Sequence, residues 1–408
     1  MSKISLKHSG GNVVSLNSPT NAPGAADVAF KLPNADGSNG QAIVTDGSGN
    51  LSFGNVAGGS TRNLIINGAM NVAQRGTSFT NVGAQEYTLD RFTTLHSYGG
   101  TQMGVSQSST SPDGFSNSYK LDVNTADTSI GAAEFVFIRH KLEAQDLQQL
   151  AYGTSGAKSI TLSFYVRSNV TGTYAICLQQ KDNSSKQVNG SYTINSADTW
   201  ERKTFTYAGD TSGVINNDNG HGLDILWTLV AGSDRTSGSV RSTWTAHANA
   251  DESVGHTANI LSSTSNNFHL TGVQLEVGSV ATDFEHRSFA QELALCQRYF
   301  QSITTGFVTA CRGASSSMLL YSVTTPVNLR SSPTVASNSD LGHSSYTVRS
   351  YRDGSGTSDS TSTPSANSTY FRSEGNVVHL QQDGFSVTDD RSATIFIGGG
   401  AITMDSEL

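Results

Sequence analysis

The chain has 408 residues, of which 36% are hydrophobic and only 14% are charged, and 41 of them are glycine. This balance favours many short strands joined by polar turns and argues against helical bundles, which are rich in charged residues and leucine. The net charge is −8 and no lysine follows Lys203, which argues against nucleic-acid binding and against docking on anionic membranes. No run of 18 apolar residues occurs and the first residues lack the apolar core of a signal peptide, so we expect neither membrane insertion nor export.

Residues 1–60 contain short strand-like runs separated by turn sequences. Asp-Gly and Gly-Asn pairs between apolar runs are typical of β-turns. The predicted strands are Lys3–Lys7, Asn12–Leu16, Gln41–Thr45 and Leu51–Phe53. Too few apolar residues occur here for an independent core, so we expect the segment to become ordered only by winding with identical chains or by docking on another protein.

Residues 61–287 are predicted to form a β-sandwich. The cleanest run is Ser159–Ser168, in which Ile160, Leu162, Phe164 and Val166 alternate with mostly polar residues. Strands at this spacing, with polar turns between them, are typical of sandwiches. A short helix is predicted over Glu143–Ala151, and the other predicted strands are Leu64–Ile66, Tyr87–Thr94, Tyr119–Val123, Phe135–Arg139, Tyr174–Gln179, Trp200–Tyr207, Leu223–Val230 and Phe268–Val277.

The clearest helix in the chain is predicted over residues 288–301. Ser288 suits the N-cap, and Gln291 stands three residues later, as in a capping box. The spacings of four, three and four positions place four apolar residues on one face: Phe289, Leu293, Cys296 and Phe300. This stripe is wide for a helix that faces solvent, so the four residues are candidates for an interface between chains.

Residues 302–408 are predicted to form a second, small β-sandwich domain. The predicted strands are Phe307–Cys311, Met318–Val323, Tyr346–Tyr351, Val377–Leu380, Phe385–Val387 and Thr394–Ile397. Between them, Asp353–Ser368 consists almost wholly of small polar residues, which predicts a solvated loop. The whole chain is therefore expected to be all-β apart from the short helix of the sandwich and the linking helix.

No catalytic signature is found in the sequence. GxSxG, P-loop and HExxH motifs are missing, and no Cys/His spacing suits a metal. Glycan cleavage needs two carboxylates, and the candidates are Asp283 with Glu285 and Asp389 with Asp390. We interpret both pairs as solvated turn charges, and we predict no catalytic residue and no cofactor.

Two other residue classes have simple interpretations. Asp218 and Asn219 could offer oxygen atoms to calcium, but an Asx-rich turn is the simpler interpretation, so no metal site is predicted. Cys177, Cys296 and Cys311 are far apart in the sequence and are interpreted as small buried hydrophobic residues.

Two long runs resemble a signature of bacteriophage tail fibre and receptor-binding proteins. The first is NLIINGAMNVAQRGTS at 63–78. The second comprises GVQLEVG at 272–278, ATDFEHR at 281–287 and ELALCQRYF at 292–300. Together they bracket well over half of the chain. The resemblance implies a virion protein with a carbohydrate-binding-module-like jelly roll, usually a homotrimer, which adheres to a glycan of the host surface.

The resemblance also implies roles for the parts of the chain. Residues 1–60 are expected to attach the protein to a tail or baseplate protein of the virion. Residues 61–287 correspond to the jelly roll, 288–301 to the linking helix, and 302–408 to a domain expected to be distal. The protein would be assembled in the cytoplasm of the bacterial host and would adhere without catalysis.

Sugars are held by aromatic faces and by polar side chains, which directs attention to aromatic residues outside the predicted core. Trp244 lies in an irregular polar stretch, and Tyr98 precedes a Gly-Gly pair, whereas Trp227 lies within a strand and is interpreted as core. Further glycan candidates border the polar loop of the last domain: Tyr346, Arg349, Tyr351 and Tyr370.

Three other classes of function stay open at this point. The first is a structural virion fibre or decoration protein without receptor contact. The second is a polysaccharide depolymerase. The third is a secreted bacterial adhesin, which the missing signal peptide disfavours.

Overall fold

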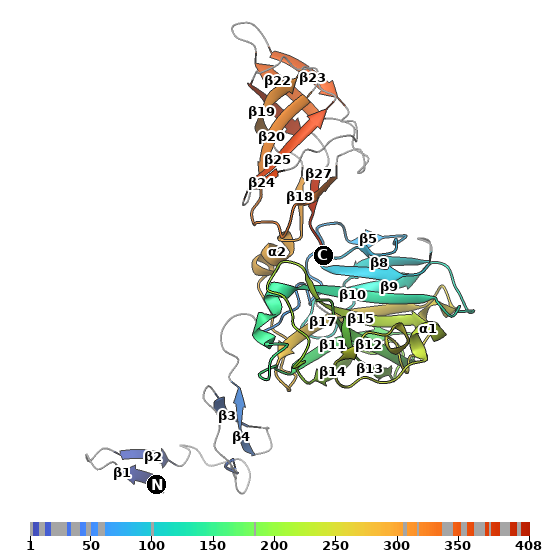
Figure 1. Ribbon diagram of the computed structural model, residues 1–408, viewed down its shortest axis with the longest axis vertical. Coiled ribbons are helices and arrows are strands. Elements are labelled where there is room, and N and C mark those ends of the chain that lie inside the picture. Colours follow the sequence, from blue (N-terminus) through green and yellow to red (C-terminus); the bar gives the residue numbers. More distant parts are fainter. Residues whose placement is uncertain are drawn as a thin grey trace. The chain divides into compact units, whose positions relative to one another are not determined.

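The computed structural model describes residues 3–7, 13–17, 31–33, 41–45, 50–55, 62–98, 102–182, 185–304, 308–315, 318–336, 346–351, 357–362, 372–374, 377–383, 392–397 and 401–408. The chain divides into two compact units, Met1–Ser60 and Thr61–Leu408. Figure 1 labels the elements and colours them by their order in the sequence.

The first unit contains two antiparallel β-ribbons. β1 (Lys3–Lys7) pairs with β2 (Val13–Asn17), and β3 (Gln41–Thr45) pairs with β4 (Leu51–Asn55). The predicted strands of this segment are confirmed to within a few residues. Ile43 and Val44 are 57% and 40% exposed, so β3 leaves both of these apolar side chains largely uncovered.

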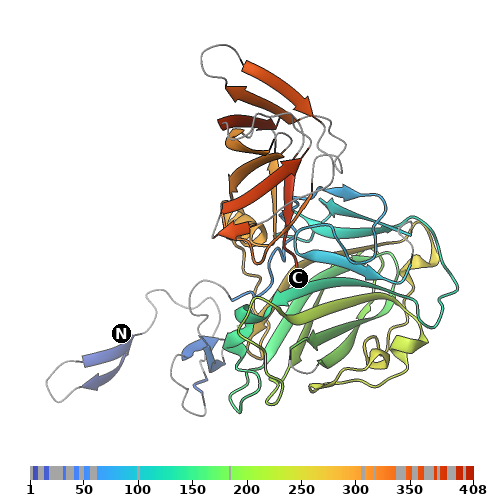
Figure 2. The same cartoon turned by 45° about the horizontal axis from the view of Figure 1, so that its top comes forward.

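The second unit contains a sandwich of two antiparallel sheets that pack face to face (Figures 1 and 2). The seven-stranded sheet has the order β16 (Thr245–Ala246), β13 (Lys186–Ile194), β12 (Gly172–Gln180), β15 (His221–Ala231), β10 (Phe135–Glu143), β7 (Phe92–His96) and β6 (Glu86–Tyr87). The six-stranded sheet has the order β14 (Glu201–Tyr207), β11 (Ile160–Ser168), β17 (Asn267–Val277), β9 (Ser118–Val123), β8 (Met103–Ser108) and β5 (Ser78–Phe79). The prediction of an all-β sandwich is confirmed.

The sandwich core follows the alternation of its strands. Ile160, Leu162, Phe164 and Val166 of β11 are fully buried. Trp227 of β15, predicted as core, is also fully buried, and its ring meets that of Phe164 edge-on at 5.8 Å. The helices between the strands are short: η1 (Ala144–Leu150), α1 (Ser233–Thr236), η2 (Asn249–Asp251) and η3 (Ile260–Ser262).

Two strand predictions near the start of the sandwich are wrong. Leu64–Ile66 is not a strand, because the Asn63 side chain takes over part of the pairing: its Oδ1 accepts from the backbone N–H groups of Ile65 (2.9 Å) and Leu275 (3.1 Å). Tyr87–Thr94 is not one strand but the hairpin of β6 and β7. Arg91 in its turn has a φ of 68°, in the left-handed region and outside the β region.

The linking helix is shorter than predicted. α2 spans Phe289–Gln297 rather than 288–301, although the capping box of Ser288 with Gln291 is confirmed. The helix ends because the two residues after Gln297 turn to Glu143 of the sandwich. Arg298 Nε lies 3.0 Å and Tyr299 Oη 2.7 Å from Glu143 Oε2. Phe300, predicted on the helix, instead begins a strand.

The last part of the chain forms two further antiparallel sheets. The three-stranded sheet has the order β18 (Phe300–Thr304), β27 (Ala401–Asp405) and β21 (Thr334–Ala336). The other has the order β23 (Thr357–Ser362), β22 (Tyr346–Tyr351), β26 (Ser392–Ile397), β19 (Val308–Ser315), β20 (Met318–Thr324), β25 (Val377–Asp383) and β24 (Arg372–Glu374).

One prediction for this region is wrong and one lies beyond the structure. The polar tract Asp353–Ser368 was expected to be a loop, but β23 lies within it and pairs with β22 along its whole length. Ser and Thr residues pair here because a β-ladder is made by backbone groups, whatever the side chains. The predicted strand Phe385–Val387 lies outside the described residues.

Candidate functional site

The strongest candidate site is the outer face of the seven-stranded sheet, which points away from the core. Alternation along β10 sends Val136 and Ile138 into the core, so Phe137, Arg139 and Lys141 point outward. The register places these three beside β15 residues that also point outward: Phe137 opposite Thr228, Arg139 opposite Leu226, and Lys141 opposite Asp224. The face therefore has an apolar half and a charged half.

The apolar half is a small cluster of its own, separate from the sandwich core. Phe137, Cys177 and Leu226 are buried, and Leu95 and Phe135 are half-buried beside them. The rings of Phe135 and Phe137 stack with centroids 5.0 Å apart. Leu95 and Phe135 therefore offer apolar surface at an edge of this cluster.

The segment after β15 covers part of the apolar half. The guanidinium carbon of Arg235, in α1, lies 3.8 Å from the Phe135 ring centroid, which is a cation–π contact. Arg235 also pairs with Glu252, which is itself buried and accepts a hydrogen bond from Gln179 Nε2 at 2.8 Å. This buried pair holds the segment that contains Arg235 and Glu252, called the Arg235 cover below, against the sheet. The cover therefore forms a fixed border of the outer face.

The charged half is built around Asp224, whose side chain is only 1% exposed. Its carboxylate accepts hydrogen bonds from Arg139 Nη2 at 2.7 Å and His221 Nε2 at 2.6 Å, and Lys181 Nζ lies 3.4 Å away. Burial alone would raise the pKa of Asp224, but His221 and Arg139 hold it well below its usual range. Asp224 is thus a fixed negative charge with three basic neighbours.

Lys141 and Tyr87 lie at the other end of the charged half. Lys141 Nζ and Tyr87 Oη both donate hydrogen bonds to the carbonyl oxygen of Leu408. Burial and the nearby Arg139 lower the pKa of Lys141 to about 8. The charged half therefore lies between the Arg235 cover and the end of the described chain.

The two glycan candidates of the sandwich lie apart from each other. Tyr98 follows β7, is half-buried against the sandwich core, and donates a hydrogen bond from Oη to Glu134 Oε2 at 3.2 Å. Trp244 precedes β16 at the opposite edge of the sheet. Its Nε1 donates to the Ala208 carbonyl oxygen at 2.9 Å and its ring meets Tyr152 edge-on at 5.6 Å, so Trp244 serves packing.

The other glycan candidates lie in the last part of the chain. Tyr346, Arg349 and Tyr351 are residues of β22, which pairs with β23 on one side and β26 on the other. Tyr370 lies outside the described residues.

The four candidates for an interface between chains differ in exposure. Phe289 is 59% exposed and Leu293 is partly exposed. Cys296 and Phe300 are buried within this chain, and the Arg75 guanidinium carbon lies 3.8 Å from the Phe300 ring centroid. Phe289 and Leu293 are therefore the members that a second copy could reach.

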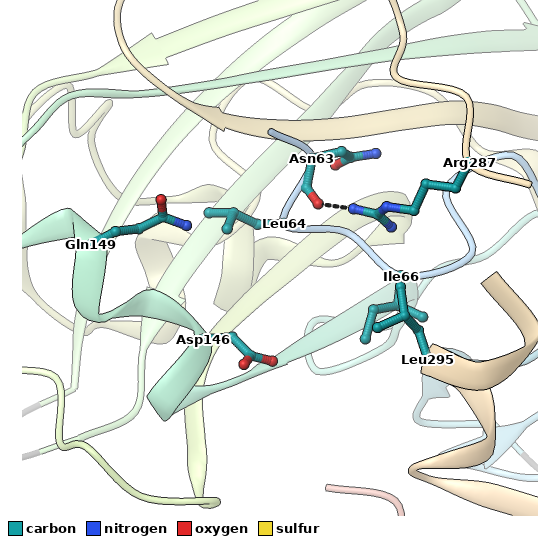
Figure 3. A pocket seen from close by; sticks show the side chains of 7 residues that line it. All are labelled: Asn63, Leu64, Ile66, Asp146, Gln149, Arg287 and Leu295. Atoms are coloured by element: carbon teal, nitrogen blue, oxygen red, sulfur yellow. Dashed lines mark hydrogen bonds between the residues drawn. The ribbon is translucent and has the colours of Figure 1, made fainter. Parts of the chain in front are cut away.

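A pocket lies between the entry segment of the sandwich, η1 and α2 (Figure 3). Its volume is about 170 Å³, below the roughly 300–1,000 Å³ of typical ligand pockets. The Arg287 guanidinium donates to the Asn63 carbonyl oxygen (Figure 3), and its charge is paired with Glu292, whose Oε1 lies 3.4 Å from Arg287 Nη1. The remaining lining residues are Leu64, Ile66, Asp146, Gln149 and Leu295.

Of the predicted carboxylate pair Asp283 and Glu285, Asp283 is exposed, whereas Glu285 serves the fold. Glu285 accepts from the backbone N–H groups of Arg62 at 3.1 Å and Asn63 at 2.7 Å. Asp218 accepts from the Gly220 N–H at 2.8 Å, and Asn219 donates to the Arg330 carbonyl oxygen at 2.6 Å. Asp389 and Asp390 lie outside the described residues.

Among the described residues, potential metal-ligating side chains do not gather in groups of three. None of the described helices is long and apolar enough to cross a membrane. Cys177 and Cys296 are buried free thiols, as predicted.

The sequence analysis did not identify any residue of the charged half as a candidate site residue. Asp224 is a single carboxylate inside an apolar strand, and Arg139 and Lys141 recur at a spacing of two in β10. A charge inside an apolar strand, and a charge pair at strand spacing, are signals that could have found the site.

Comparisons with known proteins identify no family for this chain. No family model and no curated protein matches the chain. Among solved structures, the enzymatically active domain of tailspike protein 4 from bacteriophage CBA120 matches with 10% identity and a TM-score of 0.29, over 53% of this chain and 21% of that chain. The chain thus spans about a fifth of the length of that tailspike structure.

Carbohydrate-binding modules are also among the matches. The family 11 module from Clostridium thermocellum, solved with a β-1,3-1,4-mixed-linked tetrasaccharide, shows 11% identity and a TM-score of 0.25, over 52% of this chain and 99% of that chain. A family 4 module shows 15% identity and a TM-score of 0.27, over 52% of this chain and 97% of that chain. With TM-scores below 0.5, these matches assign neither a family nor a ligand to this chain.

Proposed function

We propose that this chain is a bacteriophage tail fibre protein that binds a glycan of the host surface on the outer face of the seven-stranded sheet. One observation carries the proposal: half-buried Leu95 and Phe135 stand on the same face as the charged set of Asp224, Arg139 and Lys181. Sugar rings combine apolar faces with hydroxyl groups, so a sugar-binding surface needs both kinds of contact side by side.

The polar groups of this face are held in place before any ligand arrives. Arg139, His221 and Lys181 are oriented by the single buried carboxylate of Asp224, and the Arg235 cover is held by Glu252. Groups that are already ordered lose little conformational entropy on binding. An ordered face of modest size suits the weak, repeated contacts of an adhesion protein.

The assembly belongs to the same proposal. Three copies would present three sites, and linked weak sites can exceed the affinity of one site by about 100-fold or more. Residues 1–60 would attach the trimer to a tail or baseplate protein, and residues 302–408 would lie at the distal end. The protein would then be part of the virion, assembled in the host cytoplasm, and would adhere without catalysis.

The test is binding of fluorescently labelled full-length protein to bacterial cells that adsorb the parent phage. Leu95→Glu places a charge on the apolar half and is expected to abolish binding. Val280→Glu is the matched control, because Val280 is 70% exposed and follows β17 of the other sheet. Both variants should keep the wild-type circular dichroism spectrum, and a lower thermal midpoint is expected for Leu95→Glu because Leu95 packs against the apolar cluster.

Each outcome separates the alternatives. Unchanged binding by Leu95→Glu would refute the outer face as the site and direct attention to Tyr346, Arg349 and Tyr351 of β22. No binding by the wild-type protein would favour a structural fibre or decoration protein. Release of reducing ends from the host polysaccharide in the same assay would identify a depolymerase.

A further inference from the structure

The charged half of the outer face carries more positive than negative charge. Arg139, Lys141 and Lys181 supply three cations, whereas Asp224 is the carboxylate that Arg139 and Lys181 contact. His221 adds no charge at neutral pH, because burial lowers its pKa from the usual value near 6.5. Around this charged half, two of the three cations therefore have no carboxylate of their own.

Neighbouring carboxylates reduce this excess but do not remove it, because two of them already pair with other cations. Glu252 pairs with Arg235 on the cover, and Glu407 pairs with Arg91. Asp182, which follows Lys181, accepts from the Asn216 backbone N–H at 3.0 Å and from its side-chain amide at 3.3 Å. These donors are neutral, so Asp182 keeps its negative charge and offsets one of the cations, which leaves an excess of one positive charge.

The cations also keep hydrogen-bonding capacity that the described residues do not use. Arg139 donates from Nη2 to Asp224, but its Nε is buried and has no acceptor among the described residues. Lys181 Nζ donates to Gln179 Oε1 at 2.6 Å and can donate two more hydrogen bonds, while its side chain is 26% exposed. The unused donors of the partly exposed Lys181 ammonium are open to a bound anion, and the positive charge of Arg139 beside it would stabilise that anion.

We infer that the glycan bound by the outer face is acidic, with a carboxylate or phosphate group on its sugar ring. The anionic group lies against Arg139 and Lys181, and the apolar face of the ring lies against Leu95 and Phe135. This inference rests on the function proposed above and adds the chemical class of the ligand.

The first experiment compares each acidic saccharide with a neutral partner of the same ring. Oligogalacturonate is compared with its methyl ester, and a phosphorylated mannan oligosaccharide with its dephosphorylated form, which distinguishes carboxylate from phosphate. Calorimetric titration of the full-length protein is expected to show one acidic saccharide binding at least about 10-fold more tightly than its neutral partner, since hydrogen bonds between charged groups are the strong ones. The advantage should shrink with added salt.

The second experiment uses paired variants on host cells. Lys181→Gln should weaken binding about 10-fold, whereas Lys120→Gln should not. Lys120 is the matched control, because it is 30% exposed and pairs with Asp122 at 2.8 Å on the opposite sheet. The thermal midpoints of both variants should equal that of the wild type.

Two results would overturn the inference while leaving glycan binding intact. One is equal affinity for the acidic and neutral members of each pair, with Leu95→Glu abolishing both. The other is wild-type cell binding by Lys181→Gln, or equal losses for Lys181→Gln and Lys120→Gln. Failure of the proposed function itself has a different signature, because Leu95→Glu would then bind cells normally.

Discussion

At the scale of single residues, Gly272 shows how closely side chains approach the backbone of the six-stranded sheet. Its φ of 59° is one that residues with a side chain rarely adopt. A Cβ atom at this position would stand 2.8 Å from Phe115 Cζ and 2.8 Å from Tyr165 Cδ2. Two aromatic rings therefore rest on β17 at the point where the strand has no side chain.

Gly272→Ala should reduce the free energy of unfolding by about 2–3 kcal/mol, because it combines backbone strain with displaced rings. Gly114→Ala is the control. Gly114 has a φ of 87° but nothing within 4 Å of an added Cβ, so only strain of about 1 kcal/mol is expected. Chemical denaturation measures both losses, and equal losses would contradict the contribution of the rings.

Two buried histidines make stability depend on pH. Burial lowers the pKa of His256 to about 4 and that of His269 to about 3. Both values lie below the usual value near 6.5, so the unfolded chain binds more protons than the native one in this range. Stability is therefore complete above pH 6.5 and is lost as the pH falls below it.

The expected slope is up to about 1.4 kcal/mol per pH unit for each histidine. His256→Phe keeps an aromatic ring beside Tyr174 but cannot bind a proton. Denaturation between pH 6.5 and 5 should therefore show a smaller slope for this variant. A profile parallel to that of the wild type would count against the titration of His256.

At the scale of elements, the sequence predicts best the strands whose alternation is strict. β11 and β17 were predicted to within one residue, because one side of each faces a continuous core. β8 and β13 were missed. β13 carries polar residues at several positions, and it contains Gly190. It forms a strand because β12 pairs with it from Gly172 to Gln180. Such pairing partners are invisible in local sequence.

The site was harder to predict than the fold for the same reason. Arg139 and Asp224 are 85 positions apart and meet only through the register of β10 with β15. Trp244 and Tyr98 were chosen for their residue type, and Trp244 uses its indole N–H within the chain. A residue type suggests a role, but the pairing of strands decides which side chains share a surface.

α2 provides the prediction at this scale. It exposes Phe289 at its start and buries Cys296. We expect light scattering to give three times the mass of one chain, and Phe289→Asp to lower it to one. Val214→Asp, at a position 47% exposed, should remain trimeric. An unchanged mass for Phe289→Asp would show that α2 does not contribute to the interface.

At the scale of the whole second unit, the end of the described chain fastens onto the sandwich. The Ser406 N–H donates to the Tyr299 carbonyl oxygen at 2.8 Å, and Arg330 Nε donates to the Ser406 carbonyl oxygen at 2.8 Å. Glu407 pairs with Arg91, which is only 1% exposed. The sandwich thus obtains the counter-charge for a buried arginine from the far end of the sequence.

Deleting Glu407 and Leu408 should destabilise this edge by about 3–5 kcal/mol, because a buried arginine loses its partner. Hydrogen exchange should show lost protection in peptides that cover β6 and β7, with peptides from β12 and β13 unchanged. Asp405→Asn is the control, since Asp405 is 41% exposed and its pair with Arg75 is expected to contribute less than about 1 kcal/mol. Equal loss of hydrogen-exchange protection in all peptides would show that Glu407 and Leu408 do not stabilise this edge locally.

The separation of Arg91 and Glu407 by 316 positions has a consequence during synthesis. A ribosome adds about 5–20 residues per second, so tens of seconds pass between the appearance of the arginine and that of its carboxylate. Throughout this interval the nascent chain carries a positively charged edge that its own sequence cannot yet neutralise. The centre of the sandwich can form early, but the edge made by β6 and β7, among the first to be translated, is among the last to be completed.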